Sequence, residues 1–141
     1  MRVRSAVLMD ASPEPMRPQG IDTTVLPALL ARLGSDVAHD VRWQLGTDLV
    51  NLAAVLDRAL RPHPDVLAIA RQAHVLIALA GTAGAGTLTA HARALLDAAH
   101  AGDVRSCAAM GPGIMPEIQR LVDFVQSCAV PVPQSVPQSV P

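Results

Sequence analysis

The stretch that decides the fold is residues 65–88, with the sequence DVLAIARQAHVLIALAGTAGAGTL. When residues 65–82 are projected at about 100° per residue, as in an α-helix, two faces separate. One broad face is apolar and carries Val66, Ile69, Ala70, Ala73, Leu76, Ile77 and Ala80. The opposite face carries Leu67, Arg71, His74, Ala78 and Gly81. Because His74 falls away from the apolar stripe, we expect its imidazole to lie in solvent, largely neutral and nucleophilic at pH 7.

The composition limits what the chain can be. With 141 residues there is room for one domain, and 50% hydrophobic residues are enough to build its core. The net charge of −1 argues against a nucleic-acid-binding protein, which would carry a basic stripe. One Trp, one Phe and no Tyr leave no aromatic platform for stacking bases or sugars. The core must then be aliphatic, which suits the packing of helices.

The whole middle of the chain has the pattern of helices. No alternating, β-branched run bounded by a hairpin turn occurs, so no strands are expected. We expect helices over about 22–33, 35–60, 64–82, 86–101 and 103–127, the last interrupted at Gly111-Pro112-Gly113 and resuming at Pro116. The second helix has an apolar stripe of Val37, Val41, Leu45, Leu49, Leu52, Val55 and Leu56. Short links between amphipathic helices favour an all-α fold: an antiparallel four-helix bundle with an additional short N-terminal helix.

Two flanks differ from this middle region. Residues 1–20 hold three prolines and little periodicity, which predicts a flexible leader. Residues 129–141 repeat Val-Pro-Gln-Ser, and such a Pro-rich tail is expected to be disordered; a spacer or a ligand for a partner is the alternative. The domain itself is then residues 21–128.

The run from Gln72 to Ala92 holds no Asp, Glu, Lys or Arg and approaches the length of a membrane span. The glycines of residues 81–86 divide it, however, into the end of one helix and the start of the next. No membrane association is therefore expected. The apolar run of residues 6–9 is too short for a signal peptide, which favours the cytoplasm. Cys107 and Cys128 have no partner at metal-ligand spacing and are predicted to be reduced and half-buried.

Around His74 the small and apolar residues follow the motif of a known family. The matching positions are Ala73, His74, Leu76, Ala80, Gly81, Gly84, Ala85 and Leu88. The chain thus resembles the histidine-containing phosphotransfer (HPt) domains of multistep phosphorelays. The likeness extends over residues 21–128, through Leu33-Gly34-Ser35-Asp36 and through the end of the fourth helix at residues 95–103. It implies a bundle of four long helices in which the reactive histidine faces solvent.

Three positions after His74 depart from that motif. Ile77 stands where the family usually has lysine, Ala78 where it has glycine, and Leu79 where serine is common. Ile77 removes a cation that in the family lies near the phosphoryl group, and Ala78 adds a methyl group beside the imidazole. Arg71 lies one turn before His74 on the same face and is expected to replace the missing charge, because side chains three apart on a helix are neighbours and guanidinium pairs well with phosphoryl oxygens.

The resemblance implies a phosphocarrier that takes a phosphoryl group onto His74 and passes it between receiver-domain aspartates. The partners would be receiver domains of response regulators or hybrid histidine kinases, and the receiver would supply the magnesium ion, so the chain needs no cofactor or metal of its own. It has no ATP-binding loop, so kinase activity of its own is not expected. Gly81 matches the motif and counts, with Arg71 and Ala78, among the supporting residues, and Leu67, Ile77 and Ala78 would suit docking.

Two alternatives remain open from the sequence. The first is a degenerate HPt-like domain that only docks a receiver or kinase; the second is an unrelated helical bundle. The other histidines, His39, His63, His91 and His100, are expected to be solvated surface groups. His91 and His100 are nine residues apart and do not lie on adjacent turns, so a two-histidine metal site is not expected.

Overall fold

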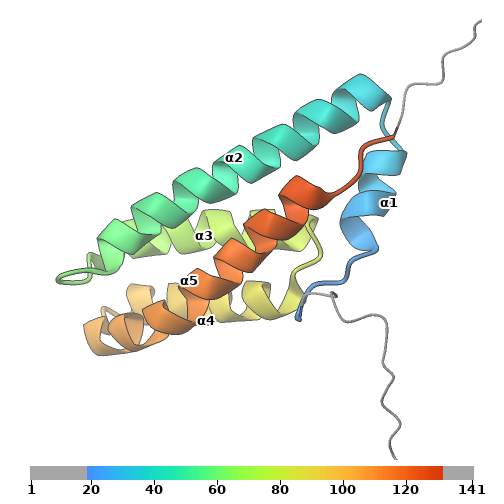
Figure 1. The fold of residues 1–141 in the computed structure, drawn as a ribbon. Coiled ribbons are helices and arrows are strands. Elements are labelled where there is room, and N and C mark those ends of the chain that lie inside the picture. The colour runs from blue at the N-terminus through green and yellow to red at the C-terminus, as the bar shows by residue number, and fades with distance from the viewer. Residues whose placement is uncertain (1–18, 132–141) are drawn as a thin grey trace, which may run out of the picture.

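The computed structural model describes residues 19–131 and folds them into five α-helices, with no strand in that range. The helices are α1 (Val25–Ala31), α2 (Ser35–Leu60), α3 (Val66–Thr82), α4 (Gly86–His100) and α5 (Val104–Ser127), shown in Figure 1. The prediction of an all-helical chain is therefore confirmed for the described residues. The predicted leader over 1–20 and the predicted Pro-rich tail over 129–141 lie almost wholly outside them.

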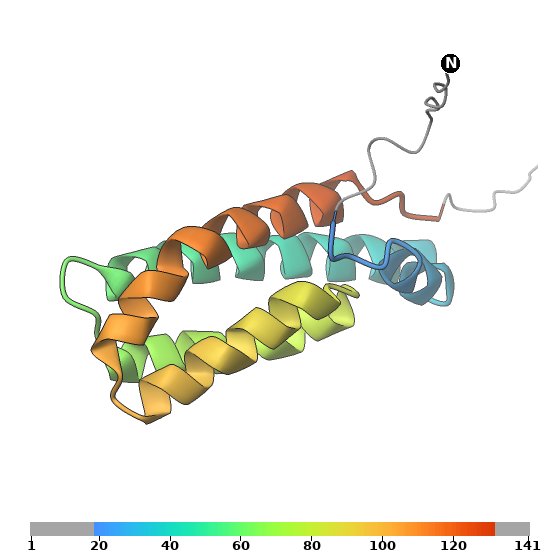
Figure 2. The ribbon, with the colours of Figure 1, turned by 90° about the horizontal axis from the view of Figure 1, so that it is seen from below.

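The four longer helices contact one another in a closed ring. α2 packs on α3 and on α5, while α4 packs on the other sides of the same two helices, and α1 packs on α2. Consecutive long helices run in opposite directions, as their short links require (Figures 1 and 2). The space between them is filled mainly by leucine, isoleucine, valine and alanine, and no described polar or charged residue is buried there. This apolar core is the main source of stability, since burial removes hydrocarbon from water.

The boundaries of α3 and α4 follow from capping groups that the sequence supplies. The Asp65 carboxylate accepts a hydrogen bond from the Ala68 N–H at 3.2 Å and caps the start of α3. At the other end of α3, Gly84 has a φ of +82°, and the N–H of Ala85 donates to the Ala80 carbonyl at 2.8 Å. Gly102 ends α4 in the same way, with a φ of +69°. Both helices therefore begin and end close to the predicted residues.

Gly84 also ties the start of the domain to the α3–α4 turn. The Asp22 N–H donates to the Gly84 carbonyl at 2.8 Å, and a Cβ at position 84 would lie 2.8 Å from the Asp22 carbonyl oxygen. The first helix, Val25–Ala31, is shorter than the predicted range of 22–33. The Asp22 carboxylate accepts from the N–H of Thr24 at 3.0 Å, and this local turn takes the place of the first helical turn.

The predicted interruption of the last helix at Gly111-Pro112-Gly113 is wrong, because α5 is continuous through both Pro112 and Pro116. Each proline removes one backbone donor, but both rings lie on the exposed side. The buried side keeps its apolar residues in register, and Gly111 allows Leu60 of α2 to approach, since a Cβ there would lie 3.2 Å from the Leu60 Cδ1. Tertiary packing thus outweighs the local cost, and the helix bends in its first half (Figure 2).

The predicted core stripe of α2 is wrong at one residue. Val37 is 52% exposed, whereas its neighbour Ala38 is fully buried. Val37 lies about a quarter turn from the line of the buried leucines, and Ala38 lies on that line. The four leucines that the pattern places in the core, Leu45, Leu49, Leu52 and Leu56, are all buried there.

Candidate functional site

His74 lies in the middle of α3 with its side chain on the exposed side. The nearest core residues before and after it in the sequence, Ala73 and Leu76, are fully buried. All five residues assigned to the second face of the helix are exposed: Leu67, Arg71, His74, Ala78 and Gly81. The separation of α3 into a buried and an exposed face, which the sequence predicts, is therefore confirmed.

The His74 imidazole has both ring nitrogens available. No hydrogen bond joins it to another described residue, and the only other ionisable side chain on α3 is Arg71, one turn before it. Arg71 likewise forms no ion pair within the range 19–131. A neutral imidazole in this position has a free lone pair for nucleophilic attack, and a cation three residues away lies within reach of an anion bound to it.

The backbone under His74 is held firmly. Ile69, Ala73, Leu76 and Ala80 are buried with no measurable exposure and anchor α3 along its length. The Asp65 cap and the Gly84 turn fix the two ends of the helix. The imidazole is thus presented from a helix that is packed along its length and capped at both ends.

The apolar residues predicted for docking differ in how far they reach the surface. Leu67 is 70% exposed, the largest fraction among the exposed large hydrophobic residues, and lies two turns before His74. Ala78 is exposed one turn after His74, and Gly81 is exposed in the following turn, where a Cβ would meet nothing within 4 Å. Ile77 is only half-buried and packs against the core, so it reaches the exposed face by its edge.

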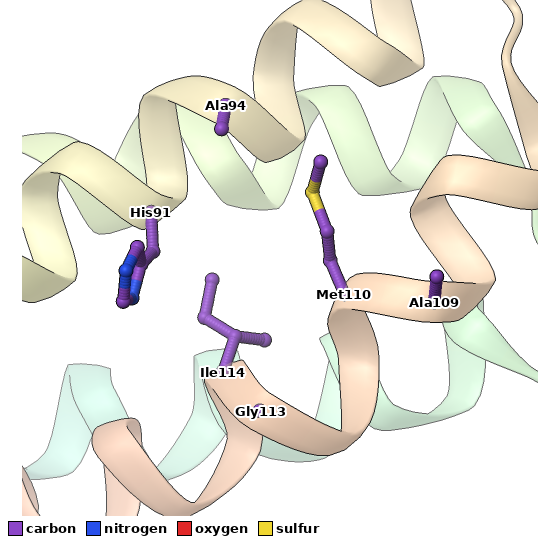
Figure 3. Close-up of a pocket in the computed structure, with 6 residues that line it drawn as sticks. All are labelled: His91, Ala94, Ala109, Met110, Gly113 and Ile114. Carbon is purple, nitrogen blue, oxygen red and sulfur yellow. The ribbon is translucent and has the colours of Figure 1, made fainter.

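The sequence predicts that His91 is a solvated surface group, but in the structure it also contacts another helix. Its Nδ1 lies 2.6 Å from the Oε1 of Glu117 on α5, and the carboxylate accepts a hydrogen bond from the ring. The ring also lines a cavity of about 300 Å³ between α4 and α5 with Ala94, Ala109, Met110, Gly113 and Ile114 (Figure 3). His91 and Glu117 come together only when α4 packs against α5, and the sequence offers no local signal for such a pair. His39, His63 and His100 are exposed, as predicted.

The two cysteines are free thiols, as predicted, but more deeply buried than expected. Burial raises the pKa of the Cys107 thiol, and it also raises the pKa of the Cys128 thiol. Burial and a raised pKa both disfavour the thiolate, which is the nucleophilic form of cysteine.

Two searches of the described residues bear on other kinds of site. No group of three or more His, Cys, Asp or Glu side chains between residues 19 and 131 is placed to hold a metal ion. In the same range, no helix combines the length and the apolarity needed to cross a membrane.

Comparison of the chain with protein-family models, with curated proteins and with solved structures finds no match. Its function is therefore inferred from the arrangement of its own residues.

Proposed function

We propose that this chain is a histidine phosphotransfer protein of a two-component phosphorelay that carries a phosphoryl group on His74. The observation behind the proposal is the exposed imidazole at the centre of a helix that buries Ile69, Ala73, Leu76 and Ala80 completely on its other side. The ring of contacts among α2, α3, α4 and α5, with the short α1 beside α2, supports an antiparallel four-helix bundle of the HPt type.

The proposed transfer requires from this chain only a nucleophilic imidazole held in position. The unprotonated nitrogen of the His74 imidazole attacks the phosphorus of an aspartyl phosphate on a receiver domain. A nitrogen–phosphorus bond forms as the bond from phosphorus to the aspartate oxygen breaks, and the aspartate leaves as a carboxylate. A second receiver aspartate reverses these steps. Positioning and charge neutralisation dominate this kind of transfer, and the receiver contributes the magnesium ion.

Arg71 supplies the positive charge on this side of the transfer. Its guanidinium stands one turn before His74 on the same exposed face and is free of ion pairs with other described residues. A planar guanidinium can bind two phosphoryl oxygens at once. In this role Arg71 takes the place of the lysine that Ile77 replaces.

The surface around His74 suits a receiver. Ala78 and the edge of Ile77 lie one turn after the imidazole and Leu67 lies two turns before it, while Gly81 leaves open space two turns after it. The partners in this proposal are receiver domains of response regulators or of hybrid histidine kinases, in the cytoplasm.

The exposure of Leu67 also favours a second candidate: a domain that docks a receiver or kinase without carrying phosphate. The apolar Ile77 at the lysine position supports that alternative. Both candidates use the same face of α3, but only the first requires the imidazole.

The test uses a panel of receiver domains labelled with radioactive acetyl phosphate and mixed with the full chain. A phosphocarrier takes up label that is lost in acid and survives base, and a second unlabelled receiver removes it. His74→Gln should abolish the label, whereas the matched control His91→Gln should keep it. Receiver binding without label in the wild type, unaffected by His74→Gln, identifies the docking module instead.

A further inference from the structure

The outward face of α2 carries a regular stripe that no other described helix covers. Its members within the helix are spaced three or four residues apart and lie within about 40° of one line at 100° per residue. They are Asp36, Asp40, Trp43, Thr47, Val50, Ala54 and Arg58, with Arg61 directly after the end of the helix, and all are exposed except the half-buried Thr47. We call this set the α2 stripe. α2 lies along one edge of the molecule (Figure 1), and the exposure of the α2 stripe places it on the outer side of the helix.

The middle of the α2 stripe is apolar. Trp43, the only tryptophan of the chain, is 62% exposed, and Val50, two turns further on, is 45% exposed. Trp43, Thr47 and Val50 also line one side of a groove of about 370 Å³ whose other side includes Gln126 of α5. A large exposed aromatic residue beside a groove is typical of an interface, where tryptophan contributes much of the binding free energy.

The two ends of the α2 stripe carry opposite charges. Asp36 and Asp40 lie at its N-terminal end, and Arg58 and Arg61 lie at its C-terminal end. Arg61, directly after the helix end, is already paired with Asp57 of α2. Asp36, Asp40 and Arg58 form no ion pair with another described residue. The α2 stripe is therefore a charge-polarised surface with an apolar centre, with Asp36 and Asp40 at one end and Arg58 at the other end free of ion pairs with described residues.

We propose that the α2 stripe binds a second copy of this chain, with the two α2 helices antiparallel about a two-fold axis. In that arrangement Asp40 lies opposite the partner's Arg58, Trp43 covers the partner's Ala54, and Thr47 meets the partner's Val50 at the centre. Each contact forms twice, as two-fold symmetry requires. The groove beside Thr47 provides space for the partner's Val50.

The charges select both the occupant and its direction. An antiparallel copy places each acidic end against a basic end, whereas a parallel copy would place Asp40 against the partner's Asp40. The surface is thus complementary to itself, which is the property an isologous dimer needs. The dimer leaves the exposed face of α3 out of the contact and does not depend on the function proposed for His74.

The first test measures the mass of the full chain by sedimentation over a range of concentrations, together with the emission of its single tryptophan. The expected result is a dimer whose formation shifts the Trp43 emission to shorter wavelength. Val50→Asp should leave a monomer with an exposed Trp43. The matched control is Val104→Asp, because Val104 is also 45% exposed but lies on α5; it should still dimerise. Far-UV circular dichroism verifies that both variants stay helical.

The second test exchanges the charges. Asp40→Arg alone and Arg58→Asp alone should each weaken the dimer at least tenfold, because each places like charges together at both ends of the contact. The double variant Asp40→Arg with Arg58→Asp restores the opposite-charge pairs and should recover dimerisation. Arg93→Asp on α4 is the control for a change of net charge.

The proposal is overturned by a chain that stays monomeric at every concentration, by a dimer that survives Val50→Asp, or by a double charge exchange that does not restore association. It is also overturned if Trp43 emission shifts only when a receiver domain is added. None of these results bears on labelling of His74, so failure here and failure of the phosphocarrier are separate outcomes.

Discussion

The two faces of α3 both carry large apolar residues, but these residues differ completely in their exposure to solvent. On the buried face, Leu76 and Ile69 have no exposure at all, whereas on the outer face Leu67, only two residues before Ile69, is 70% exposed. The buried face fixes the helix to α2 and α4, while the outer face contributes almost nothing to the core. The difference indicates that stability and candidate chemistry occupy separate faces of one helix, so each can be altered without the other.

The same substitution on the two faces should give the largest contrast. Leu76→Ala removes a fully buried side chain and is expected to lower the free energy of unfolding by about 3 kcal/mol. Leu67→Ala, at the exposed position, should change it by less than about 0.5 kcal/mol. Urea unfolding followed by circular dichroism measures both. Equal losses at the two positions would mean that Leu67 is covered in solution.

A smaller effect is expected from charge on the outer face. Arg71→Ala should slow phosphoryl transfer to His74 about tenfold, equivalent to about 1.4 kcal/mol of activation free energy, and leave stability unchanged. Arg93→Ala, an exposed arginine on α4, is the matched control. Rapid-quench measurement with a labelled receiver gives the rates. A wild-type rate in Arg71→Ala would remove this residue from the transfer step.

Access to the imidazole should have a milder influence. Ala78→Leu adds bulk one turn after His74 and is expected to slow transfer several-fold, because the partner's active site must approach over this position. Ala108→Leu places the same bulk on an exposed site of α5 and should have no effect. The comparison fails if both variants transfer phosphate at the wild-type rate.

The smallest effect is expected at the N-terminal cap of α5, away from both faces of α3. Hydrogen bonds from the Ser106 hydroxyl and N–H lower the pKa of the Asp103 carboxyl at the start of α5. A carboxyl with a lower pKa in the folded state adds stability that is present above about pH 4 and is lost as the pH falls below that value. Asp103→Ala should therefore lower the melting temperature slightly at pH 7 and by a smaller amount at pH 2.5. An equal decrease at both pH values would show that the cap does not act through its charge.

Much of the fold could be predicted because its signals are local. Asp65 and Gly84 mark the ends of α3 by their own hydrogen bonds and backbone angles, and the 3.6-residue period places His74 on the outer face. What could not be predicted depends on packing between distant segments. The continuity of α5 through Pro112 rests on its buried side and on the fit of Gly111 to Leu60, and the contact of His91 with Glu117 exists only once α4 meets α5.

The exposed imidazole of α3 is the centre of the functional proposal, and site-resolved mass spectrometry of the phosphorylated full chain tests it most directly. After incubation with a phosphorylated receiver under neutral conditions, the phosphoryl group should be found on His74 alone. A phosphoryl group on His91, on another histidine or on a carboxylate, with His74 unmodified, would contradict the proposal.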